Sequence, residues 1–159
     1  MKILVDADSC PVSVRAVVQK AAVRTGLPAV FAANRPIPEL GGNALMELCS
    51  GDEGAADDRI VELAETGDLA ITRDVGLAKR LVEKSIAVID DRGRQFTKDN
   101  IGQAYSIRCF HVGLAESGAE IVRTANYGKK ELKSFAASFD KILRSLIKGV
   151  PQEKQTKNS

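Results

Sequence analysis

The 159-residue sequence lacks the residue types on which several kinds of protein depend. It has no Trp, a single His (His111) and three Cys far apart, Cys10, Cys49 and Cys109. An odd number of widely separated cysteines argues against a disulfide framework and against a zinc site with paired ligands. One His leaves little for a Ser-His-Asp triad or a His-rich zinc centre. Any metal would therefore be held mainly by oxygen, which favours Mg²⁺ or Mn²⁺.

Long apolar runs and a phosphate-binding loop are also missing. No window approaches the ~20 continuous apolar residues of a membrane span. Asp6 and Asp8 stand where a signal peptide would carry its apolar stretch. We therefore expect a cytoplasmic protein that does not enter a membrane. The Gly-containing stretch SGDEG, 50–54, lacks the Lys and the Ser or Thr of a P-loop.

The pattern of apolar segments predicts alternating strands and helices in one domain. Strands are expected at 2–6, 28–34, 44–50, 68–72 and 86–90, and helices at about 11–24, 58–67, 74–84, 98–118 (one or two helices) and 127–149. This alternation is typical of a parallel sheet covered by helices. We predict an α/β fold with three α/β/α layers, a short mostly parallel sheet and a helical C-terminus. The domain should span 1–149, with 150–159 as a disordered tail.

The last predicted helix carries an apolar stripe at helical spacing. We expect this stripe to pack on the core of the domain. Its members are Leu132, Phe135, Phe139, Ile142, Leu143, Leu146 and Ile147.

Aspartates follow the ends of several predicted strands. Asp6 and Asp8 come just after the first strand and Asp74 just after the fourth, while Asp57 begins a helix after the third. The carboxyl ends of parallel strands meet at one edge of a sheet, so we expect these side chains to converge there. Gathered carboxylates repel one another unless a divalent cation binds, and such a cation can activate water against a phosphodiester.

Some of these acidic residues also have structural interpretations. Asp57, Asp58 and Asp74 could cap helices. Asp90 and Asp91 end the fifth strand and could join the acidic group, or begin a turn before Arg-Gly.

Charge is unevenly distributed along the chain. Residues 1–74 carry 7 Lys and Arg against 12 Asp and Glu, whereas residues 75–159 carry 16 against 9. This asymmetry indicates a metal site beside a phosphate-binding surface, or else a solvated basic helix. Because no aromatic residues are interleaved, we expect only salt-sensitive, nonspecific contact with nucleic acid. The basic residues expected near the acidic edge are Arg73, Lys79, Arg80, Arg92, Arg94 and Lys98.

Three stretches carry a resemblance to a known family. VDADSCPV (5–12), GAADDRIVELAETGDLAITRDVGLA (54–78) and RGRQFTKDNI (92–101) resemble the YaiI/YqxD family of uncharacterised bacterial proteins, over roughly 1–120. The C-terminal quarter departs from the pattern, because it lacks the family's Gly-Pro link. These proteins resemble PIN-like nuclease domains, which implies a PIN-like fold and, as a hypothesis, hydrolysis of RNA with Mg²⁺ or Mn²⁺.

The resemblance also nominates site residues. The family's first acidic pair falls on Asp6 and Asp8, the Asp of its AD pair on Asp57, and the Asp after its fourth strand on Asp74. Asp58 holds a more variable position. The hypothesis makes Asp6, Asp57 and Asp74 direct or water-bridged metal ligands and Asp8 a more distant or second-metal ligand, so that all four are candidate catalytic residues.

A different enzyme class has a similar order of residues. Haloacid dehalogenase-like phosphatases would use Asp6 as nucleophile and Asp8 as general acid, with Thr72, Lys79 or Lys84, and the pair 90–91 downstream. Against this, Cys10 stands where Thr is expected, and the helix that begins at Pro11 leaves no room for the usual loop. A non-catalytic module that binds metal or nucleic acid is a third alternative. The sequence leaves open whether the chain forms a homodimer.

Minor candidates have structural interpretations that we prefer. Cys10 is expected to be a packed thiol, because nearby aspartates would raise its pKa, and His111 a surface or half-buried helix residue. Asn34, Thr72 and Asn100 could orient water or phosphate, but such residues more often serve turns or caps.

Overall fold

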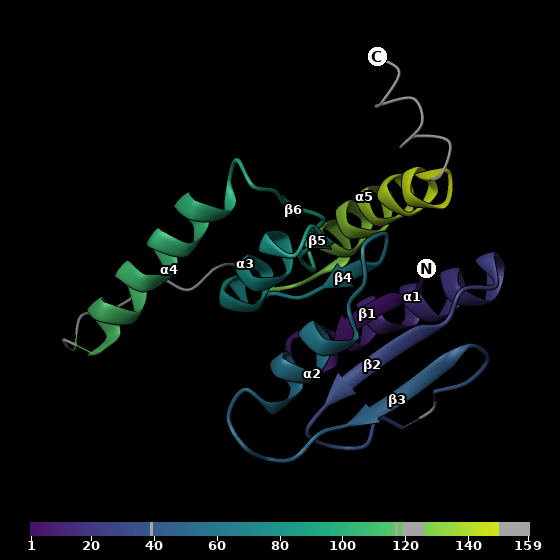
Figure 1. Cartoon of the computed structure of the whole chain (residues 1–159), viewed down its shortest axis with the longest axis horizontal. Coiled ribbons are helices and arrows are strands. Elements are labelled where there is room, and N and C mark those ends of the chain that lie inside the picture. Colours follow the sequence, from purple (N-terminus) through teal and green to yellow (C-terminus); the bar gives the residue numbers. More distant parts are fainter. Residues whose placement is uncertain (39, 117, 119–125, 150–159) are drawn as a thin grey trace.

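A six-stranded sheet forms the centre of the computed structural model, which describes residues 1–38, 40–116, 118 and 126–149 (Figure 1). The strand order is β3-β2-β1-β4-β5-β6. The first five strands run parallel, and β6 pairs antiparallel with β5. The strands are β1 (Ile3–Asp6), β2 (Ala29–Ala33), β3 (Ala44–Leu48), β4 (Leu69–Ile71), β5 (Ala87–Ile89) and β6 (Gln95–Phe96). The predicted α/β class and mostly parallel sheet are confirmed.

Helices cover both faces of this sheet and give three layers (Figure 1). Helices α1 and α5 share one apolar core with one face, while α2, α3 and the start of α4 share a second core with the other. The helices are α1 (Val12–Thr25), α2 (Ala55–Leu63), α3 (Val75–Glu83), α4 (Ile101–Glu116) and α5 (Lys129–Ile147), and a 3₁₀ turn, η1 (Ala7–Ser9), follows β1.

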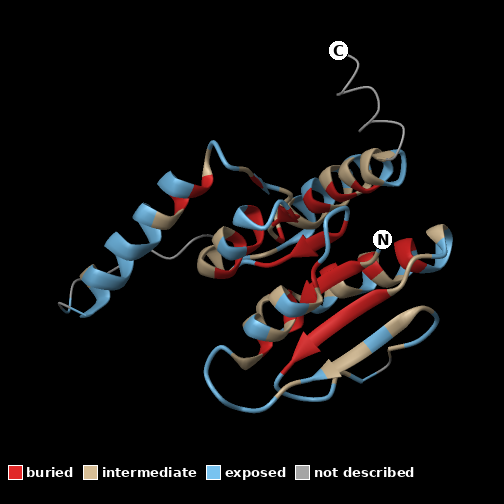
Figure 2. Cartoon of the chain, in the orientation of Figure 1, coloured by how far each residue is buried: buried red, intermediate tan, exposed pale blue. Residues whose placement is uncertain are grey.

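The central strands are apolar on both sides because both sides are covered. All four residues of β1 and all five of β2 are buried (Figure 2). Ile3 and Val5 belong to the core under α1 and α5, whereas Leu4 belongs to the core under α2 and α3. Such continuous apolar runs are typical of parallel strands covered on both faces.

The predicted stripe of α5 packs on the core, apart from its last member. Phe135, Phe139 and Leu143 are fully buried, and the two phenyl rings stack at 5.3 Å between centroids. Leu132, Ile142 and Leu146 pack partly buried against the same core. Ile147, at the end of the helix, is 47% exposed.

Several element boundaries differ from the sequence prediction. Helix α2 begins at Ala55 and ends at Leu63, because the Asp68 carboxylate accepts the Glu65 N–H and holds a turn where helix was expected. The antiparallel strand β6 was not predicted, since a two-residue strand carries no periodicity. Helix α1 begins one residue after Pro11, which occupies the N-cap. The predicted tail, 150–159, lies outside the described residues.

The turn between β5 and β6 lies directly against α5. Gly93 has a φ of 86°, and a Cβ there would stand 2.8 Å from both the Ser134 carbonyl oxygen and the Ser138 Cβ. The Ser138 hydroxyl donates to the Gly93 carbonyl at 2.6 Å, and the Ser134 hydroxyl donates to the Arg92 carbonyl at 3.0 Å. Only glycine fits this close approach and this backbone conformation.

Helix α4 leaves the body of the molecule after its first turns (Figures 1 and 2). Ile101 and Ala104 are buried, whereas Ile107, Phe110 and Val112 are 48%, 65% and 46% exposed. Among the described residues, no helix combines the length and apolar character needed to cross a bilayer.

Candidate functional site

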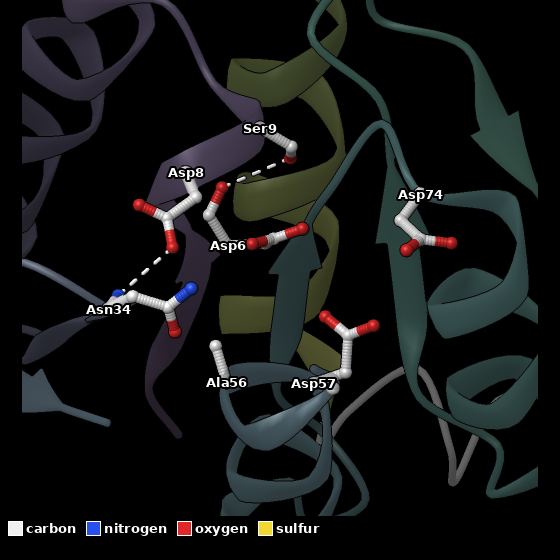
Figure 3. A pocket seen from close by; sticks show the side chains of 8 residues that line it. Asp6, Asp8, Ser9, Asn34, Ala56, Asp57 and Asp74 are labelled. Atoms are coloured by element: carbon white, nitrogen blue, oxygen red, sulfur yellow. Dashed lines mark hydrogen bonds between the residues drawn. The ribbon is translucent and has the colours of Figure 1, made fainter. Parts of the chain in front are cut away.

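Four of the predicted acidic residues line one hollow at the carboxyl ends of the strands (Figure 3). Asp6 ends β1, Asp8 lies in η1, Asp57 lies in the first turn of α2, and Asp74 precedes α3. The hollow has a volume of about 250 Å³ and is lined by Asp6, Asp8, Ser9, Asn34, Gly54, Ala56, Asp57 and Asp74. No Lys or Arg is among these lining residues.

Asp6 is the most deeply buried member of the group, with 5% of its surface exposed. Its Oδ2 accepts a hydrogen bond of 2.7 Å from the Thr72 hydroxyl, and that hydroxyl accepts the Asp74 backbone N–H at 3.0 Å. Burial raises the pKa of Asp6, and the charges of Asp74 and Asp8 raise it further, against hydrogen bonds from Thr72 and Ser9. The fold therefore places a carboxylate where its charge is only partly compensated.

Asp57 points into the same hollow (Figure 3), whereas its neighbour Asp58 is not among the lining residues. Burial raises the pKa of Asp57 to about 6, with the charges of Asp6 and Asp74 as the next causes. Asp58 has a side chain that is 64% exposed and pairs with Arg80 Nη1 at 2.9 Å. Adjacent aspartates of one helix thus differ in surroundings, because only one of them faces the sheet edge.

Asp74 lines the hollow and also caps α3. Its Oδ1 accepts the backbone N–H groups of Gly76 at 2.8 Å and Leu77 at 3.2 Å. The cap interpretation is therefore confirmed for Asp74. It is wrong for Asp57 and Asp58, because the N-cap of α2 is Gly54 and the two aspartates lie inside the first turn.

Asp8 and Ser9 are held by backbone groups of neighbouring segments. The Asn34 backbone N–H donates to Asp8 Oδ2 at 3.0 Å (Figure 3). The Ser9 hydroxyl donates to the Asp6 carbonyl at 3.1 Å and accepts the Arg73 N–H at 3.2 Å. The segments that follow β1, β2 and β4 are thereby connected around the hollow.

Asp90 and Asp91 do not join the acidic group, so the expectation that they converge there is wrong. Asp90 Oδ1 accepts the backbone N–H groups of Arg92 at 2.8 Å and Arg94 at 2.9 Å, which makes it a turn residue. Asp91 is 1% exposed and forms ion pairs with Arg73 and Arg92, at 3.4 Å and 3.9 Å.

Comparison with known proteins identifies the family. The family model described as "Uncharacterized BCR, YaiI/YqxD family" matches residues 4–145. The chain belongs to the YaiI/YqxD family. A UPF0178 protein of Treponema denticola is 48% identical over 148 residues, covering 93% of this chain and 95% of the relative. UPF0178 proteins of Treponema pallidum and Myxococcus xanthus are 40% and 37% identical, covering 93% and 96% of this chain and 84% and 100% of their own lengths. No solved structure matches the chain.

The basic residues predicted near the acidic edge are mostly engaged elsewhere in this YaiI/YqxD chain. Lys79 pairs with Glu83, Arg80 pairs with Asp58, and the Arg94 guanidinium lies 5.3 Å from the centre of the Phe96 ring. Arg73 alone of the six lines a second hollow, which adjoins the first.

Arg108 of α4 lines that second hollow too and was not predicted. Its segment carries no motif that could have pointed to it. Only the packing of α4 on α3 brings it there.

Three of the minor candidates do not line the acidic hollow, whereas Asn34 lines it and Thr72 donates to Asp6. Asn100 accepts the Thr97 N–H and donates to the Gln95 carbonyl, and His111 is exposed on α4. Cys10 is buried, and burial raises its pKa to about 12, with the Asp6 charge as the next cause. As expected, Cys10 is a packed thiol.

The ligand chemistry of the hollow fits a hard cation that keeps part of its water shell. The described residues contain no group of three His, Cys, Asp or Glu side chains in position to hold one metal ion. Mg²⁺ is usually bound through one or two carboxylates while it keeps several waters. A hollow lined by four carboxylates and free of basic side chains suits that mode of binding.

Proposed function

We propose that the chain is a metal-dependent phosphodiesterase that hydrolyses RNA with Mg²⁺ or Mn²⁺. One observation carries the proposal: Asp6, Asp57 and Asp74, from three separate elements, line one hollow that contains no Lys or Arg. The raised pKa values of Asp6 and Asp57 indicate negative charge that the protein leaves without a full partner. Perturbed carboxylates gathered in a cleft are typical of functional sites.

Asp6, Asp57 and Asp74 would hold the cation, directly or through water. When bound, the cation would supply an activated water and neutralise charge on the phosphodiester. Thr72 fixes the Asp6 carboxylate by its 2.7 Å hydrogen bond and links it to the Asp74 backbone. Such supporting hydrogen bonds orient ligands and maintain their affinity.

Asp8 has a different place in the proposal. Its Oδ2 is occupied by the Asn34 N–H, so we assign it to an outer position, or to a second metal, rather than to the first cation. The Asn34 side chain also lines the hollow, where its amide can donate to a phosphate oxygen.

The phosphatase alternative finds less support. Lys84 donates to the carbonyls of Val61 and Ala64, and Lys79 pairs with Glu83, so neither lysine lines the hollow. Asp90 serves the β5–β6 turn. Asp57 and Asp74 would also have no role in that chemistry.

Metal binding and cleavage should be measured on Asp6→Asn, Asp57→Asn and Asp74→Asn. Asp58→Asn is the matched control, because it removes the same charge from the exposed neighbour of Asp57. We expect Mn²⁺ affinity, followed by calorimetry, to fall at least about 100-fold in Asp6→Asn and to remain near the parent in Asp58→Asn. Cleavage of a labelled single-stranded RNA should follow the same order and stop with chelator.

Three results would contradict the proposal. Mn²⁺ binding that survives Asp6→Asn would place the metal elsewhere. Metal binding without cleavage in Mg²⁺, Mn²⁺ or Co²⁺ would make the chain a binding module. Turnover of p-nitrophenyl phosphate that requires Asp6 and is inhibited by beryllium fluoride would establish the phosphatase instead, because beryllium fluoride mimics an aspartyl phosphate.

A further inference from the structure

A second hollow adjoins the acidic one, and two arginines are among the residues that line it. It is lined by Asp8, Ser9, Arg73, Asp74, Val75 and Arg108 and has a volume of about 380 Å³. Asp8, Ser9 and Asp74 belong to both hollows. A ligand held by the shared carboxylates would therefore have two guanidinium groups beside it.

Arg73 is fixed at this position from two sides. Its Nε lies 3.4 Å from Oδ2 of the buried Asp91, and its backbone N–H donates to the Ser9 hydroxyl. Half of its side-chain surface remains exposed. Asp91 forms no hydrogen bond through this Oδ2 within the described part of the chain, so its role here is electrostatic. A buried carboxylate thus holds an arginine at the rim of the hollow.

Arg108 reaches the hollow because α4 runs antiparallel to α3. Lys79 Nζ lies 5.4 Å from the centre of the Tyr105 ring, and three residues later in α4 Arg108 lies beside the start of α3. Its Nη2 is 3.9 Å from Asp74 Oδ1, beyond hydrogen-bonding distance, and that oxygen already accepts two backbone N–H groups. Arg108 is therefore only loosely paired, with 44% of its side chain exposed.

We infer that Arg73 and Arg108 form a phosphate-binding subsite beside the acidic hollow. The inference rests on the proposed function, because it makes the bound phosphate a neighbour of the phosphodiester that is cleaved. Guanidinium groups bind phosphate through paired, charge-assisted hydrogen bonds. The substrate class is then a single-stranded polynucleotide with consecutive phosphates, rather than an isolated diester or a phosphomonoester.

The subsite can be tested by binding, independently of hydrolysis. Arg73→Gln and Arg108→Gln should be compared with Arg24→Gln, which removes the same charge from α1, where Arg24 pairs with Asp140. A labelled single-stranded oligoribonucleotide is titrated in Ca²⁺ over a range of salt concentrations. We expect each subsite variant to bind about tenfold more weakly, with a salt slope shallower by about 0.7. Arg24→Gln should stay within about twofold of the parent.

A more specific test replaces one phosphate of the oligonucleotide by an uncharged methylphosphonate. A single methylphosphonate is moved along the same strand, which removes one phosphate charge at a time. We expect one position where this change weakens binding by the parent about tenfold but has little effect on Arg108→Gln. The inference is overturned if the two arginine variants bind like Arg24→Gln, or if no position depends on Arg108. An equal result with single-stranded DNA is expected, because the contact is to phosphate.

Mn²⁺ affinity separates failure of the subsite from failure of the proposed function. Arg108→Gln should bind Mn²⁺ at least as tightly as the parent, because a positive charge beside Asp74 is removed. If Asp6→Asn loses Mn²⁺ but the arginine variants behave like Arg24→Gln, only the subsite is wrong. If Asp6→Asn keeps Mn²⁺, the proposed function fails whatever the arginines do.

Discussion

Two buried aspartates at opposite ends of neighbouring strands differ in how their charge is compensated. Asp68 precedes β4 and is 2% exposed; Asp6 ends β1 and is 5% exposed. Asp68 accepts the backbone N–H groups of Lys2 and Glu65, both at 2.9 Å, and the Lys2 ammonium at 2.7 Å. Asp6 accepts the Thr72 hydroxyl and faces other carboxylates. Burial alone therefore does not distinguish a structural carboxylate from a candidate ligand; the surrounding charges do.

The largest expected effect is the loss of folding stability when Asp68, the aspartate with a compensated charge, is replaced. Asp68→Asn should lower the free energy of unfolding by about 3 kcal/mol, because it removes the carboxylate 2.7 Å from the Lys2 ammonium, which keeps only Glu65 at 4.0 Å, and takes an acceptor from the turn. Asp6→Asn, measured by urea unfolding in chelator, should cost little or nothing. A larger loss of stability in Asp6→Asn than in Asp68→Asn would contradict the difference in charge compensation between the two aspartates.

The next effect concerns the Thr72 hydroxyl, which donates to Asp6 Oδ2 at 2.7 Å. Thr72→Val keeps the shape of the side chain and removes that bond. We expect Mn²⁺ affinity to fall about tenfold, because the ligand loses its orienting partner. Thr72→Ser, which keeps the hydroxyl, is the control and should stay near the parent in calorimetry. Equal affinity in the valine and serine variants would show that the bond is not needed.

A smaller effect of opposite sign is expected at Asp57. In chelator at neutral pH, Asp57→Asn should raise the free energy of unfolding by about 1 kcal/mol, after allowance for solvent screening. The folded-state pKa of about 6 exceeds the ordinary 3.8, so the ionised carboxylate is disfavoured by folding. The gain should therefore be full above pH 6 and disappear as the pH falls towards 3.8.

Asp58→Asn is again the control and should change stability by less than about 0.5 kcal/mol, because its pair with Arg80 is exposed. A gain for Asp58→Asn equal to that for Asp57→Asn would mean that net charge, rather than the crowding of carboxylates, is responsible.

The smallest expected effect is slow alkylation of the buried Cys10 thiol. Cys10 lies next to the acidic hollow, with a pKa raised to about 12, so its thiol should resist alkylation at mildly alkaline pH. The exposed Cys109 should react first and Cys49, whose pKa burial also raises, more slowly. Peptide mapping by mass spectrometry after timed alkylation would show the order. Early labelling of Cys10 in the folded protein would contradict this expectation, because it would mean that the reagent reaches the buried thiol.

The sequence predicted the elements that depend on apolar periodicity and the residues that follow strands. Asp6 and Asp74 could be nominated because the ends of parallel strands share one edge. Asp57 was separated from Asp58 by the family resemblance, and the structure places only Asp57 in the hollow. The PIN-like assignment remains a prediction.

What could not be predicted depends on how distant segments pack. Asp91 follows a strand, as the other candidates do, and could have joined them or begun a turn; it pairs with Arg73 and does not line the hollow. Arg108 carries no local signal, because its position follows from the packing of α4 on α3. The structural role of Asp68 was not predicted, because Lys2, with which it pairs, lies 66 residues away in the sequence.

The close seating of Gly93 on α5 has a consequence for how the protein is made. On a ribosome, α1 and all six strands emerge before α5, so the part of one apolar sheet face that α5 covers stays open to solvent until this helix follows. The hydrogen bonds from the Ser134 and Ser138 hydroxyls to the β5–β6 turn can form only then. The packing of the domain is therefore completed only when its last described helix has been synthesised.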